Sequence, residues 1–241
     1  MTAEQRRPVI AFFDVDNTLL RGASVYYVGR AAFRRGLISW RDVSVFAWHQ
    51  FRFLAVGENH RHLRSARTRA LGLVRGHHRE DIVELTRDVY LADIVPNLLA
   101  EMVARAQAHI ADGHEVWLVT ATPTILADVI VEGIGVTGAL GTGVEIAEDG
   151  RFTGEILGDL MHGQEKARAA TAFAAERGVD LADCVAYSDS ANDIPLLQAV
   201  GTAIAVNPDK RLAAHAARAG WPVIEVVPPA RRRGGKRADR A

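Results

Sequence analysis

Apolar runs of four or five residues recur along the chain, separated by stretches in which apolar residues return with helical spacing. The runs cover residues 9–13, 115–119, 184–187, 203–206 and 222–226. The helical patterns cover residues 96–111, 124–131, 165–178, 194–200 and 211–219. Strands that alternate with helices predict an α/β fold: a Rossmann-like, doubly wound, mostly parallel sheet.

Residues 21–95 break this alternation, because they hold several helical patterns and no convincing strand. They predict a helical domain inserted directly after the first strand. The insertion carries thirteen arginines against seven acidic residues. Its basic character has two interpretations: a solvated arginine-rich surface, or a positive lid over an anionic substrate. We therefore expect a core formed by residues 1–20 and 96–227 and a helical cap at 21–95.

Two other stretches stand apart from the alternation. Short alternating runs flank Asp149 and Gly150, a dipeptide that favours a two-stranded hairpin. Residues 228–241 include the basic run Arg231–Arg237 and predict a disordered, solvated tail, with contact to nucleic acid or an acidic partner as the alternative.

Composition narrows the functional classes. The 29 basic and 29 acidic residues balance, so no global field favours nucleic acid as a partner. No apolar segment approaches the roughly 20 residues that span a bilayer, and no apolar signal core precedes the first run. The single cysteine, Cys184, lies in an apolar run and predicts a small buried hydrophobe. A cytoplasmic location is expected, and the sequence leaves the oligomeric state open.

Polar clusters follow three of the predicted strands. Asp14 and Asp16 follow the first, Thr120 follows the second, and the segment Ser188–Asp193 follows the third. Lys166 opens a helix, where a cation is electrostatically unfavourable, and this indicates an anionic partner such as phosphate or Asp14. The carboxyl ends of parallel strands meet at one edge of a sheet, so these groups are expected to converge.

Their chemistry suits phosphoryl transfer. One aspartate can attack phosphorus while another handles the proton, and Mg²⁺ prefers carboxylate and carbonyl oxygens plus waters. Asp14 and Asp189 are predicted metal ligands, with the backbone carbonyl of Asp16 as a third. Alternatively, Thr120 and Thr122 could serve only as helix caps. Asp193 could occur at its position only because the helix dipole favours an acid in the first turn.

The order Asp14-Val15-Asp16-Asn17-Thr18, Thr120, Lys166 and Ser188–Asp193 resembles the four motifs of the haloacid dehalogenase (HAD) superfamily. A helical insertion after the first motif resembles the type-I caps of that superfamily. The hairpin at Gly150 and the stretch Ala205–Asp209 resemble its phosphoserine phosphatase-like branch. The resemblance covers residues 8 to 227 and implies a HAD-like core with a type-I cap.

The resemblance also implies a role for each matching residue. Asp14 would be the nucleophile that forms an aspartyl-phosphate, and Asp16 the general acid and base. Thr120, the Ala121 N–H, Lys166 and Asn192 would bind the phosphorylated substrate. Asp14, Asp16 and Asp189 would hold Mg²⁺, and Asp193 would act on the metal through water or by orienting Lys166.

The implied activity is hydrolysis of a small phosphomonoester, phosphoserine-like in the branch that the chain resembles. Phosphoserine phosphatases place an acid just after the first motif, whereas Leu19–Tyr26 contains none. Arg21 and the cap residues Arg61, Arg64, Arg67 and Arg69 favour instead a substrate with a second anionic group. Two other functions are compatible with this fold: a phosphotransferase or mutase, and a non-catalytic binding protein.

Overall fold

The computed structural model describes residues 9–36 and 74–227. Its strands form one sheet in the order β4-β3-β2-β1-β5-β6-β7. The strand bounds are β1 Ile10–Phe13, β2 Glu115–Pro123, β3 Gly138–Ile146, β4 Phe152–Leu157, β5 Val185–Ser188, β6 Thr202–Val206 and β7 Val223–Ile224. All neighbouring strands are parallel except β3 and β4, so the predicted doubly wound sheet is confirmed.

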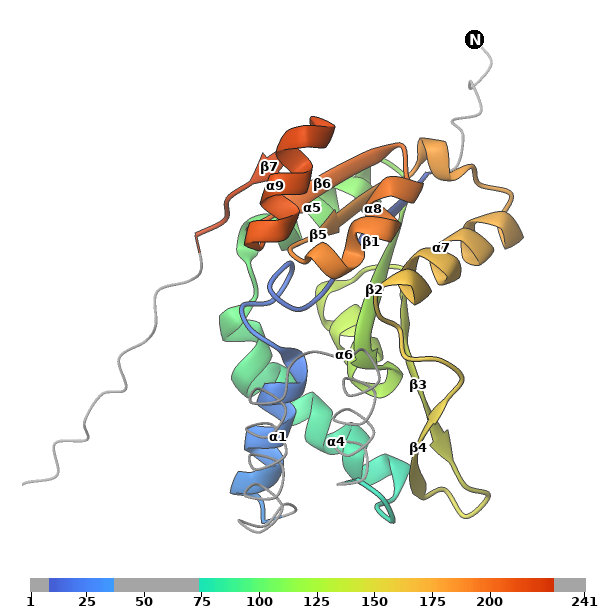
Figure 1. Cartoon of the computed structure of the whole chain (residues 1–241). Coiled ribbons are helices and arrows are strands. Elements are labelled where there is room, and N and C mark those ends of the chain that lie inside the picture. Colours follow the sequence, from blue (N-terminus) through green and yellow to red (C-terminus); the bar gives the residue numbers. More distant parts are fainter. Residues whose placement is uncertain (1–8, 37–73, 228–241) are drawn as a thin grey trace, which may run out of the picture.

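Helices cover both faces of the sheet (Figure 1). Their bounds are α1 Ser24–Arg34, α4 Arg79–Val89, α5 Ala100–Ala111, α6 Thr124–Ile134, α7 Gln164–Glu176, α8 Ile194–Ala199 and α9 Lys210–Ala219. Shorter turns are η1 Tyr90–Ile94, a π-helix, and the 3₁₀ turns η2 Val95–Asn97, η3 Leu181–Asp183 and η4 Ala191–Asp193. None of the helices described is long and apolar enough to cross a bilayer.

Strand β1 is buried on both faces, as its continuous apolar run predicts. Ile10 and Phe12 belong to a buried cluster with residues of α7, α8 and α9, whereas Ala11 and Phe13 belong to a second cluster with residues of α5 and α6. Phe13 also stacks on Tyr187 of β5, with ring centroids 4.2 Å apart. Burial of each isoleucine or phenylalanine side chain here contributes about 1.5–3 kcal/mol. This packing holds the carboxyl end of β1 in the middle of the sheet.

The structure corrects three boundaries. The predicted helix at 96–111 begins with η2 and is interrupted at Leu98 and Leu99 before α5 starts. The last predicted strand, 222–226, is reduced to Val223–Ile224. Strand β3 begins at Gly138, ahead of the predicted hairpin, because its first half pairs with β2 and its second half with β4. The turn at Gly150 is confirmed, with a φ of 79° that favours glycine.

The chain leaves and re-enters the core through two segments that lie side by side. The Arg21 N–H donates to the Asn97 carbonyl at 2.9 Å, and the Leu99 N–H donates to the Leu19 carbonyl at 2.8 Å. Between them, α1, α4 and η1 are helical, as predicted for this part of the insertion. Residues 37–73, which include Arg61, Arg64, Arg67 and Arg69, and the tail 228–241 lie outside the described residues.

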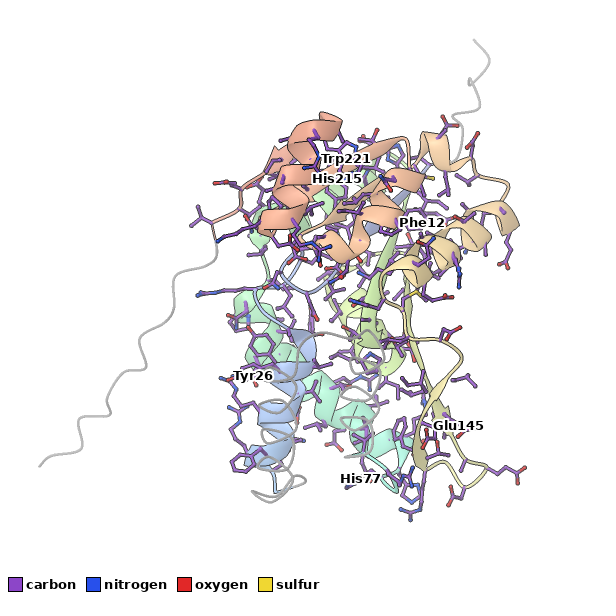
Figure 2. The ribbon with its side chains drawn as sticks, in the orientation of Figure 1. Phe12, Tyr26, His77, Glu145, His215 and Trp221 are labelled. Atoms are coloured by element: carbon purple, nitrogen blue, oxygen red, sulfur yellow. The ribbon has the colours of Figure 1, made fainter. Side chains whose placement is uncertain are left out.

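The hairpin β3–β4 also contacts the segment that precedes α4. The Gly76 N–H donates to the Phe152 carbonyl at 2.9 Å, and the Phe152 N–H donates to the His77 carbonyl at 3.0 Å. Phe152 packs with Ile82 of α4 and Ile125 of α6. Figure 2 places His77 and Glu145, which belongs to β3, at the same end of the molecule. The hairpin therefore fastens the returning part of the insertion to the sheet.

Candidate active site

Asp14 is the first residue after β1, and its position is set by the neighbouring strand. Its N–H donates to the carbonyl of Tyr187 at 2.9 Å. The chain then turns tightly, because the N–H groups of Leu19 and Leu20 both donate to the Val15 carbonyl. Asn17 takes a left-handed conformation, with φ 60°, which asparagine tolerates better than most residues. This turn keeps both carboxylates of the first motif at the edge of the sheet.

Lys166 reaches this edge from the first turn of α7. Its Nζ donates to Asp14 Oδ1 at 2.5 Å and to Asp193 Oδ2 at 2.7 Å. All three side chains are buried, and Asp193 Oδ2 also accepts a hydrogen bond from Ser188 Oγ at 2.7 Å. The anionic partner predicted for Lys166 is thus confirmed as Asp14, together with Asp193. The alternative that Asp193 only favours a helix dipole does not account for these two contacts.

Burial and crowding of negative charge perturb the carboxyl groups. Burial raises the pKa of Asp14 to about 7, and Asp193 and Asp16 add to this against the opposing effect of Lys166. Burial also raises the pKa of Asp189 to about 7, with Asp193 as the next cause. Burial alone would lower the pKa of Lys166, but Asp14 and Asp193 outweigh it and raise the pKa above its ordinary value. One lysine therefore does not neutralise the acids gathered here.

An excess of negative charge of this kind fits a bound divalent cation. Within residues 9–36 and 74–227, no three His, Cys, Asp or Glu side chains form a ready-made metal cluster. Magnesium does not require one, since it usually binds one or two carboxylates and keeps several waters. Asp14 and Asp189 are the two carboxylates predicted to bind it, and the backbone carbonyl of Asp16 is the predicted third donor.

Thr120 and Thr122 lie at the end of β2 and are both buried. The Thr120 hydroxyl donates to Thr122 Oγ1 at 2.9 Å, and the Thr122 N–H donates to Thr120 Oγ1 at 3.1 Å. Neither threonine caps α6, because its N-cap is Pro123 and no side chain caps the helix. The helix-cap interpretation is therefore wrong. Ala121, between them, accepts a hydrogen bond from Thr142 Oγ1 at 3.0 Å through its carbonyl.

The loop after β5 carries Asp189 and Asn192. Asn192 is exposed, and its Nδ2 donates to Ser190 Oγ at 3.2 Å. Asp209, which follows β6, holds the loop from the far side. Its N–H donates to the Asp189 carbonyl and its Oδ2 accepts the Ala191 N–H, both at 2.8 Å. The metal-binding candidate Asp189 thus sits on a loop that is fastened to the next strand.

Three residues support this site in ways that the sequence did not predict, although Ser188 and Asp209 lie in segments that the sequence singled out. Ser188 bonds to Asp193, Asp209 holds the Asp189 loop, and Ser24 of α1 bonds to both Asp16 and Thr122. Serine and aspartate are frequent near loops and helix starts, so their positions along the chain gave no special signal. Asp209 alone was recognisable as a helix N-cap, a role that it does fill for α9.

Known proteins resemble this chain in sequence and in fold. Residues 11–198 match the family model described as haloacid dehalogenase-like hydrolase. The chain is 42% identical over 214 residues to phosphoserine phosphatase SerB1 of Mycobacterium tuberculosis, covering 88% of this chain and 69% of that protein. It is 27% identical over 228 residues to the histidinol-phosphatase of Neisseria meningitidis serogroup C, covering 89% of this chain and 97% of that one.

Among solved structures, a protein from Bordetella pertussis Tohama I, described as one of unknown function, superimposes with a TM-score of 0.81. The two sequences are 29% identical, and the match covers 91% of this chain and 99% of the other.

Proposed function

The chain belongs to the haloacid dehalogenase-like hydrolase family and is a phosphatase, and we propose that it hydrolyses a small phosphomonoester through an aspartyl-phosphate on Asp14. The observation that carries the mechanism is the buried contact of Lys166 with both Asp14 and Asp193. A lysine held against the nucleophile favours its anionic form and neutralises an arriving phosphate.

In the first step, a carboxylate oxygen of Asp14 attacks phosphorus and the bond to the ester oxygen breaks. Asp16 donates its proton to the departing alcohol. In the second step, Asp16 takes a proton from water, the water oxygen attacks phosphorus, and the bond between phosphorus and Asp14 breaks. Inorganic phosphate leaves, and Asp14 and Asp16 return to their starting protonation states.

Other residues bind the phosphoryl group. Lys166 offers a cation, and the Ala121 N–H offers a hydrogen-bond donor at the end of β2. The Thr120 hydroxyl, which donates to Thr122 Oγ1 in this structure, would turn its hydrogen to a bound phosphoryl oxygen. Mg²⁺, held by Asp14, Asp189 and the Asp16 carbonyl, would reduce the repulsion between the nucleophile and the phosphate dianion. Asp193 supports the site by orienting Lys166, which its 2.7 Å contact with Nζ favours. Asn192 is proposed to contact the substrate from the loop after β5.

We propose a small phosphorylated metabolite as substrate. The names of the two relatives specify phosphoserine in one case and histidinol phosphate in the other. The absence of an acid in Leu19–Tyr26 argues against an ammonium group bound next to the first motif. Arg21, Arg61, Arg64, Arg67 and Arg69 are the basis in the sequence for a substrate with a second anionic group. Other arginines of the insertion pair with carboxylates of this chain: Arg30, Arg34, Arg35 and Arg75.

The test is phosphate release from a panel of phosphomonoesters, with and without Mg²⁺, for the wild type and Asp14→Asn. The panel contains phosphoserine, histidinol phosphate, glycerol phosphates, sugar phosphates and p-nitrophenyl phosphate. We expect metal-dependent release that Asp14→Asn abolishes while its circular dichroism stays unchanged. More than a few per cent of residual turnover in Asp14→Asn would exclude the covalent mechanism. Transfer of phosphate to an added alcohol without free phosphate would identify a phosphotransferase.

A further inference from the structure

Ser24 is the first residue of α1 and is completely buried at the point where the insertion leaves the core. Its N–H donates to Asp16 Oδ1 at 2.8 Å. Its Oγ lies 2.7 Å from Oγ1 of Thr122, at the end of β2. One residue of the insertion therefore contacts two separate segments of the active site.

The contact with Asp16 follows from the physics of a helix start. The first N–H groups of a helix have no partner within the helix, and the helix dipole favours an anion beside them. Helix α1 has Ala23 as its N-cap, which offers no side-chain acceptor. The carboxylate of Asp16, eight positions earlier in the chain, fills that role. One oxygen of the proposed general acid is thus held by α1.

The contact with Thr122 continues toward the phosphate site. Thr122 Oγ1 accepts the hydroxyl hydrogen of Thr120 at 2.9 Å, and Ser24 Oγ lies on its other side. All three side chains are buried, so none of these hydroxyls can exchange its partner for bulk water at no cost. The rotation of the Thr120 hydroxyl consequently depends on where Ser24 places Thr122.

We propose that Ser24 is a positioning residue for the phosphatase reaction. Its N–H orients Asp16 toward the leaving-group oxygen, and its hydroxyl positions Thr122 Oγ1, the acceptor from which the Thr120 hydroxyl turns when it donates to phosphate. This inference rests on the proposed function, because it takes Asp16 as the proton donor and Thr120 as a phosphate ligand. It assigns a role in the chemistry to the first turn of α1.

The two contacts can be separated by substitution. Ser24→Ala removes the hydroxyl and keeps the N–H. Ser24→Pro removes both, and proline suits the first position of a helix. The preceding residue, Ala23, has φ −94° and ψ 126°, a conformation that a following proline favours. Ala100→Pro is the matched control, since Ala100 is the exposed first residue of α5 and follows the extended residue Leu99.

The readout is kcat/KM for an alkyl phosphate and for p-nitrophenyl phosphate. This parameter reports the steps up to transfer of the phosphoryl group to Asp14. The alkyl alcohol needs a proton as it leaves in that step, whereas nitrophenolate does not. We expect Ser24→Pro to lower kcat/KM for the alkyl phosphate about 10- to 100-fold more than kcat/KM for p-nitrophenyl phosphate, because only the alkyl leaving group needs a correctly oriented general acid. Ser24→Ala should lower both values by a similar, severalfold factor. Ala100→Pro should change neither.

A second measurement covers the case in which Ser24→Pro does not fold. In a Thr122→Val background, Ser24→Ala should cause no further loss of kcat/KM, because the hydroxyl contact is already broken. Independent, multiplicative losses would overturn the hydroxyl half of the proposal. Amide hydrogen exchange at Ser24 should accelerate in Asp16→Ala, and unchanged exchange would overturn the other half.

Failure of this inference is distinguishable from failure of the proposed function. Asp16→Asn must itself lower the alkyl value more than the aryl value if Asp16 is the proton donor. If it does so, while Ser24→Pro lowers both values equally, Ser24 has only a structural role. If Asp16→Asn shows no selectivity, the assignment of Asp16 is wrong, whatever Ser24 does.

Discussion

Lys166 and Asp14 are 152 positions apart in the chain, yet Nζ of the lysine lies 2.5 Å from Oδ1 of the aspartate. Both side chains are almost completely buried. Asp193 makes a second ion pair with the same ammonium group. The lysine is therefore the cation that allows two carboxylates to share one buried site, and its removal has consequences for stability as well as activity.

Lys166→Met should abolish turnover and destabilise the fold by about 3–5 kcal/mol, because it leaves Asp14 and Asp193 without their cation. Without the lysine, the pKa of Asp14 rises further above its value in the unfolded chain. A raised carboxyl pKa means that stability is retained at low pH and lost as pH increases. The decrease in melting temperature of Lys166→Met relative to the wild type should therefore be larger at pH 8 than at pH 5. Lys210→Met, at an exposed position, is the control. An equal loss at both pH values would contradict the electrostatic explanation.

Asp189→Asn should remove the stabilisation that Mg²⁺ confers. A ligand at 100 times its Kd stabilises the wild type by about 2.7 kcal/mol, which a thermal-shift titration with MgCl₂ detects. The variant should show little shift over the same concentrations and negligible phosphatase activity. Asp180→Asn is the control, because Asp180 caps η3 and asparagine caps equally well. If MgCl₂ raised the melting temperature of Asp189→Asn as much as that of the wild type, Asp189 would not be a metal ligand.

Substitutions of Asp209 can distinguish its role as the cap of α9 from its role in holding the Asp189 loop. Its Oδ1 accepts the N–H groups of Arg211 and Leu212, while Oδ2 accepts the Ala191 N–H. Asp209→Asn can still cap α9 through its amide oxygen but cannot accept from Ala191 with its NH₂ group. We expect a nearly unchanged melting temperature and a severalfold higher Mg²⁺ requirement for activity. Asp209→Ala should also lose about 1 kcal/mol of stability. If both variants needed the same Mg²⁺ concentration as the wild type, Asp209 would act only as the cap of α9.

His109 should make the fold sensitive to mild acid. Its Nε2 lies 2.9 Å from the Tyr187 hydroxyl, and its pKa is lowered, chiefly by burial and then by His114. A lowered histidine pKa means that stability is complete above the ordinary value of 6.5 and is lost as pH falls below it. His109→Gln keeps a polar contact without titrating, so its melting temperature should fall less than that of the wild type between pH 7.5 and 5.5.

The control for this measurement is His215→Gln. His215 lies against Trp221, with ring centroids 4.8 Å apart, and Figure 2 shows the pair at the opposite end of the molecule from His77. This variant should keep the acid response of the wild type. If His109→Gln and the wild type lose stability in parallel, other groups cause the acid sensitivity.

The sequence alone was sufficient for features that depend on neighbouring residues. The apolar run 9–13 predicted β1, because a strand that is buried on both faces has no polar position. Asp149 and Gly150 predicted the hairpin turn, because glycine readily adopts its positive φ. The need of Lys166 for an anionic partner was also predictable, since a helix start repels a cation. Each of these properties belongs to one segment, whereas the partners Asp14 and Asp193 come from other segments.

Tertiary structure alone decided how the segments meet. The bonds from Ser24 to Asp16 and Thr122, and from Asp209 to the Asp189 loop, join elements whose proximity depends on strand order and on the return of the insertion. Tertiary structure also ruled out a capping role for Thr120. It divided β3 between a parallel neighbour, β2, and an antiparallel neighbour, β4. Local patterns of polarity carry no information about such contacts, because the free energy that selects them comes from packing the whole sheet and its helices together.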